Sequence, residues 1–240
     1  MNACIVSYFM PNINPRTVEL QKQVVDKFNR TKLPHYVMKG EIPHGLFIDY
    51  CWTLNGVPTG YFKSAVEKVK QAMDFDYIII LDIDCVPVSE NGFEYFLSKV
   101  NEGKLIGNMQ RSGHINNNDH LFAAPSCSAI SRENFIKIGT PSALETSRGD
   151  VLEEYTFKAE EHGVPVEMIP PVKFDRPPFR YEWEKDQMPY WELKNNQPNY
   201  GLGTTYGNQE AGDLFWHNFQ IRMPEQEEYF WKKCEDLLNG

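Results

Sequence analysis

The sequence lacks the cysteine patterns that mark disulfide-stapled and zinc-binding proteins. It has five cysteines, at positions 4, 51, 85, 127 and 234, and no two of them form a CxxC pair. An odd number of scattered cysteines argues against a disulfide framework and against a structural zinc site. We therefore expect reduced, mostly buried thiols in a cytoplasmic protein, because disulfides form in oxidising compartments.

Long apolar runs are also missing. No stretch approaches the roughly 18 consecutive apolar residues that a membrane-spanning helix needs. The first ten residues have no basic region ahead of their apolar part, so we expect a first strand there rather than a signal peptide. The sequence thus predicts no membrane span.

Positive charge is not in excess. The 24 Lys and Arg residues against 33 Asp and Glu residues give a net charge of −9. Nucleic-acid-binding proteins generally carry a basic balance or a basic stripe, so this charge disfavours nucleic acid as a partner, although a local basic groove is compatible with it. An anionic nucleotide ligand would be repelled unless a metal ion offset the charge locally.

Apolar β-forming segments alternate with segments of helical periodicity. Strands are expected at residues 3–9, 35–38, 77–81, 104–108, 125–130 and 164–169. Helices are expected at residues 14–28, 59–73, 90–100, 132–138, 150–162 and 225–238, and a loop with buried aromatics at residues 39–58. This alternation predicts an α/β sandwich with a mostly parallel central sheet.

Residues 170–216 differ from the rest of the chain. They are rich in Pro, Gly, Asn and aromatic residues and show little periodicity, so we expect a long, partly ordered excursion over an active site. Within it, residues 199–207 have the glycine content of a mobile lid. Their spacing fits neither GxGxxG nor a P-loop.

Asp82 and Asp84 directly follow the apolar run at residues 77–81. Ligands of open α/β sheets bind beyond the carboxyl ends of strands, and residues i and i+2 of a strand point to the same side. Two carboxylates at such a place are costly unless a cation joins them, and Mg²⁺ or Mn²⁺ prefers oxygen ligands. The pattern predicts a divalent-metal site, whereas a turn or capping role is the structural alternative.

Three segments resemble GT-A glycosyltransferases. These enzymes have a Rossmann-like fold and use nucleotide-sugars as donors. Residues 78–87 (IIILDIDCVP) resemble the DxD segment of that family, residues 132–139 (RENFIKIG) its stretch after the acceptor-side strand, and residues 149–163 the acidic helix of its inverting members. The resemblance covers roughly residues 3–170 and the late His217. It implies that Asp84 binds the metal, that Asp82 contacts the metal or the ribose, and that His217 is the remaining protein ligand. Imidazole suits Mn²⁺ better than Mg²⁺, so His217 favours Mn²⁺.

The resemblance also bears on the general base. It aligns Glu153 and Glu154 with an acidic pair whose second member is usually Asp, so Glu154 departs from the pattern and Asp150 competes with it. A carboxylate at the start of a helix is favoured in its ionised form, which suits a proton acceptor. The alternative for these residues is a solvated acidic face.

Further candidates lie on the donor side. Ser7 and Tyr8 end the first expected strand, where GT-A enzymes hold the nucleotide base; Tyr8 either stacks on that base or simply packs. Lys63 either touches the diphosphate or is a surface lysine, and Arg111 and Arg148 are comparable cases. Gln110 and the polar loop with His114 and His120 are expected to line the sugar or acceptor side.

The sequence thus predicts one GT-A-like domain over residues 1–240, with residues 1–105 binding the nucleotide-sugar and residues 106–240 forming the acceptor side. The expected activity is metal-dependent hexosyl or pentosyl transfer from a nucleotide-sugar, UDP-linked ahead of GDP-linked, to a glycan or other hydroxyl acceptor. A modified base in DNA is an alternative acceptor. A nucleotidyltransferase that makes a nucleotide-sugar and a non-catalytic sugar-nucleotide or glycan-binding module are the alternative functions. The first is disfavoured because no Gly-rich basic loop follows the first strand.

Overall fold

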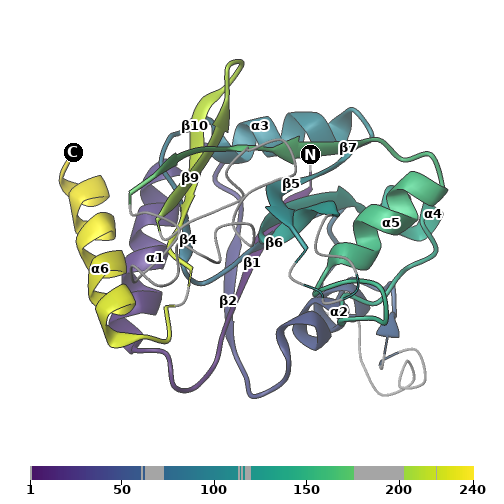
Figure 1. The fold of residues 1–240 in the computed structure, drawn as a ribbon, viewed down its shortest axis with the longest axis horizontal. Coiled ribbons are helices and arrows are strands. Elements are labelled where there is room, and N and C mark those ends of the chain that lie inside the picture. Colours follow the sequence, from purple (N-terminus) through teal and green to yellow (C-terminus); the bar gives the residue numbers. More distant parts are fainter. Residues whose placement is uncertain are drawn as a thin grey trace.

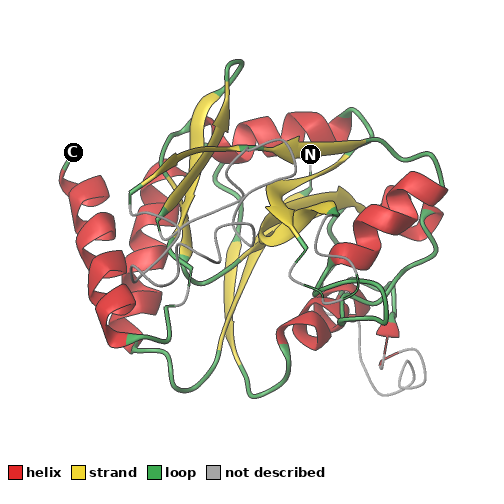
Figure 2. Ribbon diagram, in the orientation of Figure 1, coloured by secondary structure: helices red, strands yellow, loops and turns green. Residues whose placement is uncertain are grey.

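A computed structural model describes residues 2–60, 62, 73–112, 114, 116, 120–175, 203–219 and 221–240. Strands lie in the middle of the molecule, with α1 and α6 at one end and α2, α4 and α5 at the other (Figures 1 and 2). The described elements, in chain order, are β1 (Ala3–Phe9), α1 (Pro15–Phe28), β2 (His35–Lys39), α2 (His44–Leu54), β3 (Tyr77–Leu81), β4 (Cys85–Pro87), α3 (Asn91–Asn101), β5 (Leu105–Arg111), β6 (Leu121–Ser131), α4 (Arg132–Lys137), α5 (Glu153–Glu161), β7 (Val166–Ile169), β8 (Pro171–Phe174), β9 (Thr204–Asn208), β10 (Gly212–His217) and α6 (Pro224–Asn239).

The larger sheet has six strands in the order β2-β1-β3-β6-β5-β7. Strands β2 and β3 run parallel to β1, and β7 runs parallel to β5, whereas β6 is antiparallel to both of its neighbours. The sheet is therefore mostly parallel with β6 reversed. The predicted α/β fold class with a mostly parallel central sheet is confirmed.

Both faces of this sheet are covered. In β1 and β3, alternate residues such as Val6 and Ile80 join the buried cluster that contains α2, α4 and α5, where Trp52 stacks on Phe135 at 4.1 Å. The residues between them pack against α1, α3 and β10. Continuous apolar strands such as residues 77–81 are what a sheet covered on both faces requires.

A second, four-stranded sheet has the order β4-β10-β9-β8. It pairs β4, just after Asp84, with β10 from the far end of the sequence; His217 lies opposite Cys85. The expected irregular excursion at residues 170–216 thus contains β8, β9 and β10. The lid prediction is wrong for residues 204–207, which form a buried strand between β8 and β10, and residues 199–202 lie outside the described part.

Helix α2 replaces the loop that the sequence predicts at residues 39–58. Its residues Phe47, Ile48, Cys51 and Trp52 are all buried, so the segment shows no polar face and no helical period. A helix that is apolar over most of its surface gives no amphipathic signal, which is why periodicity missed it. Of the helix expected at residues 59–73, only residues 59, 60, 62 and 73 are described.

The remaining predicted elements are confirmed with shifts of a few residues, the largest being the extension of the 125–130 strand to β6. All five cysteines are free and buried, as expected. Helix α6 packs against α1, where Trp231 Nε1 donates to Thr17 Oγ1 at 2.8 Å (Figure 1). Among the described helices, none combines the length and the apolar character that crossing a membrane would require.

Candidate functional site

Asp82 and Asp84 occupy the turn between β3 and β4. The turn is closed by a hydrogen bond from Cys85 N to Asp82 O at 2.9 Å, and Asp82 N donates to Ser126 O of β6 at 3.1 Å. The fully buried Gln21 of α1 donates from Nε2 to Asp82 O at 2.6 Å and to Cys85 O at 3.1 Å. Three elements therefore fix the backbone that presents the two carboxylates.

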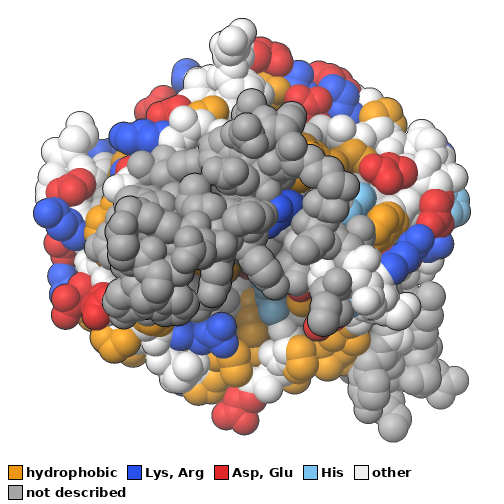
Figure 3. Space-filling view, in the orientation of Figure 1, with side chains coloured by type: hydrophobic (Ala, Val, Ile, Leu, Met, Phe, Trp, Pro, Cys, Tyr) orange, Lys and Arg blue, Asp and Glu red, His pale blue; other side chains and the backbone are white. Residues whose placement is uncertain are grey.

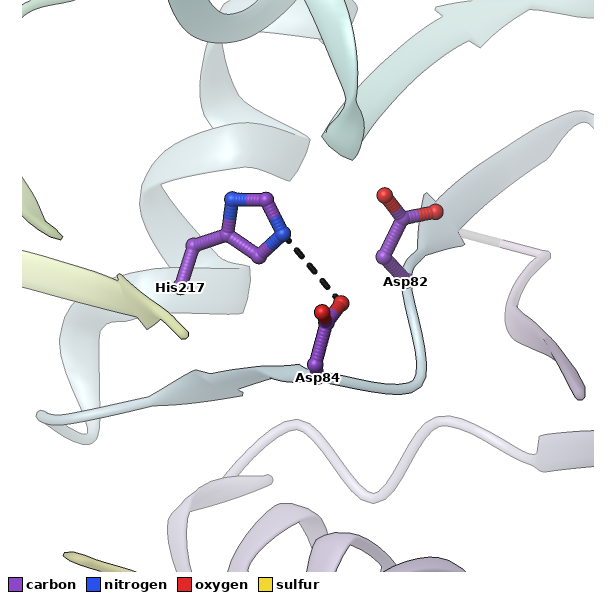
Figure 4. A group of neighbouring side chains, drawn as sticks. All are labelled: Asp82, Asp84 and His217. Carbon is purple, nitrogen blue, oxygen red and sulfur yellow. Dashed lines mark hydrogen bonds and ion pairs between the residues drawn. The ribbon is translucent and has the colours of Figure 1, made fainter. Parts of the chain in front are cut away.

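The pairing of β10 with β4 brings His217 to this turn. Asn218 N donates to Asp84 O at 2.9 Å, and His217 Nε2 lies 3.2 Å from Asp84 Oδ1 (Figure 4). Asp82 and Asp84 each offer a carboxylate oxygen, and His217 offers a ring nitrogen. These three atoms lie within 4.8 Å of one another. Among the described residues this is the one group of three or more His, Cys, Asp or Glu side chains with such spacing.

The electrostatics of the three groups are coupled. Burial raises the pKa of Asp82, with His44 acting in the opposite direction. Burial also disfavours the charged form of Asp84, but the adjacent His217 overcomes this and leaves the pKa of Asp84 lowered. Burial alone would lower the pKa of His217, yet Asp84 raises it. Two close carboxyl groups, one buried and one partly exposed, thus depend on a nearby positive charge.

The donor set fits a divalent cation. Two carboxylates and an imidazole combine hard oxygen ligands with one nitrogen, a set that Mn²⁺ accepts readily and Mg²⁺ less so. The same cation would supply the positive charge on which these two carboxylates depend.

Two pockets open at this turn. The β1 pocket, of about 370 Å³, has a lining that includes the apolar or aromatic Tyr8, Phe9 and Ile13 and the polar His44, Arg222, Asp82 and Asp84. On the face of the molecule drawn in Figure 3, hydrophobic side chains gather in the lower part of the view. The smaller β5 pocket, of about 240 Å³, joins Asp82, Asp84 and His217 to Gln110, Pro125 and Arg222.

His44 and Arg222 were not among the candidates from the sequence. His44 Nε2 lies 3.3 Å from Asp82 Oδ1, and the exposed Arg222 lines both pockets. His44 was missed because its segment was expected to be a loop. Arg222 carries no local signal, since it becomes relevant only once β10 places the residues after His217 beside Asp84.

The donor-side candidates have different surroundings. Tyr8 lines the β1 pocket, stacks on Phe47 at 4.5 Å and exchanges hydrogen bonds with the backbone of Ile42 through its hydroxyl. Ser7 is fully buried and bonds to His35 Nε2 at 2.9 Å, so it belongs to the β1–β2 packing rather than to a pocket wall. Lys63 lies outside the described residues.

The carboxylates of Asp150 and Glu154 have different surroundings. Glu154 is held by Arg148, whose Nε lies 2.9 Å from Glu154 Oε2. Asp150 Oδ1 accepts from Val151 N at 2.7 Å, and burial raises the pKa of the Asp150 carboxyl. The two candidates from the sequence therefore differ: one is occupied by a guanidinium group, and the other is partly buried and accepts from the backbone.

Glu153 is a third carboxylate, which the family resemblance places in the same acidic pair as Glu154. It is fully buried and accepts from Ser112 Oγ at 2.6 Å and from Asp150 N at 2.7 Å, while its other oxygen lies 2.5 Å from His120 Nδ1. Ser112 is two residues beyond Gln110, which is roughly 7 Å along an extended strand. The start of α5 therefore adjoins the end of β5 that lines the β5 pocket, although Asp150 and Glu154 line neither pocket at the turn.

Comparison with protein-family models and with curated protein sequences yields no match. Among solved structures, the chain is similar to a protein described as a nucleotide-diphospho-sugar transferase from Desulfovibrio desulfuricans, at 9% identity and TM-score 0.44, with 100% of this chain and 98% of that chain covered. It is also similar to a glycosyltransferase involved in glycosylation of the major capsid of the virus PBCV-1, at 10% identity and TM-score 0.42, covering 96% and 99%. A third similar structure is 4-diphosphocytidyl-2C-methyl-D-erythritol synthase from Anaerococcus prevotii, at 9% identity and TM-score 0.40, covering 76% and 94%. At these identities and scores, the similarities identify neither a family nor a reaction.

Proposed function

We propose that this protein is a metal-dependent glycosyltransferase that moves a sugar from a nucleotide-sugar to a hydroxyl acceptor. The observation that carries the proposal is the group formed by Asp82, Asp84 and His217 at the carboxyl end of β3, open to two pockets. Ligands of mostly parallel α/β sheets bind at such strand ends. The GT-A resemblance of the sequence points to the same residues.

In this proposal the whole chain acts as one unit. Residues 1–105 bind the donor and residues 106–240 form the acceptor side. The pairing of β4 with β10 supports close cooperation between the two parts, because it builds the candidate metal site from both of them.

Asp82, Asp84 and His217 hold the cation, for which Mn²⁺ is preferred over Mg²⁺. When bound, a divalent cation neutralises negative charge on a leaving diphosphate. Arg222 lines both pockets and offers a second positive charge to the same anion. Opposite unit charges about 4 Å apart attract by about 4 kcal/mol at an effective dielectric of about 20, and about 1.4 kcal/mol corresponds to tenfold in rate.

The residue that we assign as general base in an inverting transfer is Asp150. The acceptor oxygen forms a bond to the anomeric carbon, the bond from that carbon to the diphosphate oxygen breaks, and the acceptor proton goes to the Asp150 carboxylate. A pKa raised by burial makes a carboxylate a stronger proton acceptor. Glu154 is the weaker candidate because Arg148 already stabilises its charge.

The donor base is assigned to the β1 pocket, with the ring of Tyr8 in its wall and a UDP-sugar preferred over a GDP-sugar. Direct roles for Ser7, which is buried, and for Lys63 remain predictions. Free, buried thiols favour a cytoplasmic location. The net charge of −9 favours a glycan or other neutral hydroxyl acceptor over a modified base in DNA.

The identity of the released product tests this proposal. UDP-, GDP- and TDP-sugars are incubated with the wild-type protein in Mn²⁺, in Mg²⁺ and in EDTA, and nucleoside diphosphate is quantified. We expect slow, metal-dependent release of one nucleoside diphosphate that Asp84→Asn abolishes. Release of pyrophosphate from a sugar phosphate and a nucleoside triphosphate would instead establish a nucleotidyltransferase, and binding without any turnover would favour a binding module.

A further inference from the structure

We propose that His44 is a positioning residue for the metal centre: it orients the Asp82 carboxylate from outside the group of ligands. The inference rests on the proposed function, because it assigns a supporting role to a residue beside the site proposed there. His44 is the first residue of α2 and comes from a segment that no sequence pattern connects to the DxD turn.

The contact between His44 and Asp82 has the geometry of a supporting interaction. His44 Nε2 lies 3.3 Å from Asp82 Oδ1, within ion-pair distance of that oxygen. His44 is not part of the group of described residues whose ligand atoms lie within 4.8 Å of one another. It therefore acts on the site through Asp82 rather than as a ligand itself.

The plane of the His44 ring is fixed by aromatic neighbours. It lies parallel to the Tyr8 ring, at 5° and 6.2 Å, and nearly parallel to the Phe47 ring, at 16° and 6.4 Å. The Tyr8 hydroxyl is itself held by the backbone of Ile42, to which it donates at 2.7 Å and from which it accepts at 2.9 Å. The imidazole beside Asp82 is therefore aligned with two aromatic rings, one of which is held by hydrogen bonds of its own.

The helix that carries His44 is pinned in place. A Cβ atom on Gly45 would come within 2.5 Å of the Ala143 carbonyl oxygen, so the helix backbone and this loop are in direct contact. One turn later, Asp49 Oδ1 accepts from Ala143 N at 2.9 Å, and Ser142 Oγ donates to Asp49 Oδ2 at 2.5 Å. The position of His44 is thus set by packing, independently of any ligand.

Two partners therefore divide the task of holding Asp82. Gln21 holds the backbone carbonyl at 2.6 Å, and His44 faces one carboxylate oxygen at 3.3 Å. In the proposal, the contact with His44 leaves the other Asp82 oxygen available to a cation. It also restricts the carboxylate beforehand, so that less orientational freedom is lost when the cation binds. Loss of such a supporting contact typically lowers metal affinity about 10- to 100-fold.

The test measures Mn²⁺ affinity of the whole protein by titration calorimetry or by the EPR signal of free Mn²⁺. His44→Phe keeps an aromatic ring beside Tyr8 and Phe47 but has no N–H, and it is expected to weaken Mn²⁺ binding about 10- to 100-fold. His44→Gln retains an N–H donor and is expected to recover most of the affinity. His162→Phe, the same substitution at an exposed histidine beyond α5, is the control and is expected to bind as the wild type does.

A double-mutant cycle with Asp82→Asn shows whether His44 acts through Asp82. We expect His44→Phe to have no further effect in the Asp82→Asn background, because coupled residues are non-additive. Equal losses from His44→Phe in both backgrounds, or wild-type affinity in His44→Phe, would overturn the inference and leave the proposed function intact. A wild-type protein that binds no Mn²⁺ would overturn the proposed function itself.

Discussion

At the residue scale, the structure separates carboxylates that the sequence could not distinguish. Glu153 is fully buried and shapes the loop by accepting from Asp150 N, Glu154 is paired with Arg148, and Asp150 is held by a backbone N–H of its own loop. Neighbouring acidic residues in one short segment thus have three different environments, and environment decides which of them can take a proton.

Asp150→Asn is expected to reduce the rate of transfer, or of slow donor hydrolysis, by about 10²- to 10⁴-fold, the usual contribution of a general base. The KM for the donor should change little, because Asp150 lines neither pocket at the DxD turn. Steady-state kinetics provide the measurement, with the nucleotide-sugar that gives nucleoside diphosphate release in the assay proposed above.

Glu154→Gln is the matched control for that substitution. It removes a charge already satisfied by Arg148, so its effect on kcat should remain within a few-fold. A larger loss of kcat in Glu154→Gln than in Asp150→Asn would reverse the assignment of the base.

The sequence pointed to all three members of the group formed by Asp82, Asp84 and His217, but not to the residues around them. Asp82 and Asp84 were recognisable because an apolar strand leads directly into them, and His217 because of a family resemblance. Gln21, His44 and Arg222 come from α1, α2 and the segment after β10, and each reaches the site only through tertiary packing. No local pattern in a single sequence encodes those approaches.

At the element scale, α2 is the clearest departure from the sequence prediction. Its buried residues leave no polar face, and Pro43 and Gly45 at its start are typical of loops. By contrast, α1 has an Asn14 side chain that accepts from Arg16 N, a Pro at its first position and an apolar stripe, and its start was predicted to within one residue. The difference is that α1 faces solvent on one side and α2 does not.

Gly45→Ala tests the pinning of α2. The added methyl group would meet the Ala143 backbone carbonyl at 2.5 Å, and backbone cannot give way as the end of a side chain can. We expect a loss of about 1–3 kcal/mol in the free energy of unfolding, the usual cost of overpacking, measured by urea denaturation.

The same variant should also bind Mn²⁺ more weakly, because a shift of α2 moves His44 away from Asp82. Wild-type stability in Gly45→Ala would mean that the close contact between α2 and residues 143–144 is not rigid. Wild-type Mn²⁺ affinity in a destabilised variant would mean that the position of α2 does not matter to the site.

At the scale of the whole molecule, the pairing of β4 with β10 joins two segments that lie far apart in the sequence. A sheet formed by residues 85–87, 171–174, 204–208 and 212–217 could not be foreseen, because composition in that region reads as irregular and strand partners far apart in sequence leave no periodic signal. The mostly parallel sheet was predictable because local strands and helices alternate through about residue 170.

Global stability is expected to depend on His35 in mildly acidic solution. Burial, and then Lys22, lower the pKa of His35 from 6.5 to about 4. In the folded protein Nε2 bonds to Ser7, and Nδ1 is buried with no partner among the described residues, so the charged form is disfavoured. Between about pH 6.5 and pH 4 the unfolded chain binds a proton that the folded chain does not, so stability falls as pH falls through this window.

This contribution should amount to about 1–3 kcal/mol, taking the shift in pKa and some solvent screening into account. His35→Gln removes the titration while keeping a polar partner for Ser7. Urea denaturation at pH 7 and at pH 4.5 is expected to show a smaller loss of stability in His35→Gln than in the wild type. Equal losses in the two proteins would show that His35 is not the source of the dependence.

The central claim is that Asp82, Asp84 and His217 hold a divalent cation that binds a nucleoside diphosphate. The most direct test is titration calorimetry of UDP and GDP into the wild type, Asp84→Asn and the surface control Asp236→Asn, in Mn²⁺ and in EDTA. We expect one nucleotide to bind the wild type and Asp236→Asn in Mn²⁺, with affinity at least about 100-fold lower in EDTA and in Asp84→Asn. Binding that is equally tight in EDTA, or that survives Asp84→Asn unchanged, would contradict the assignment of the metal centre.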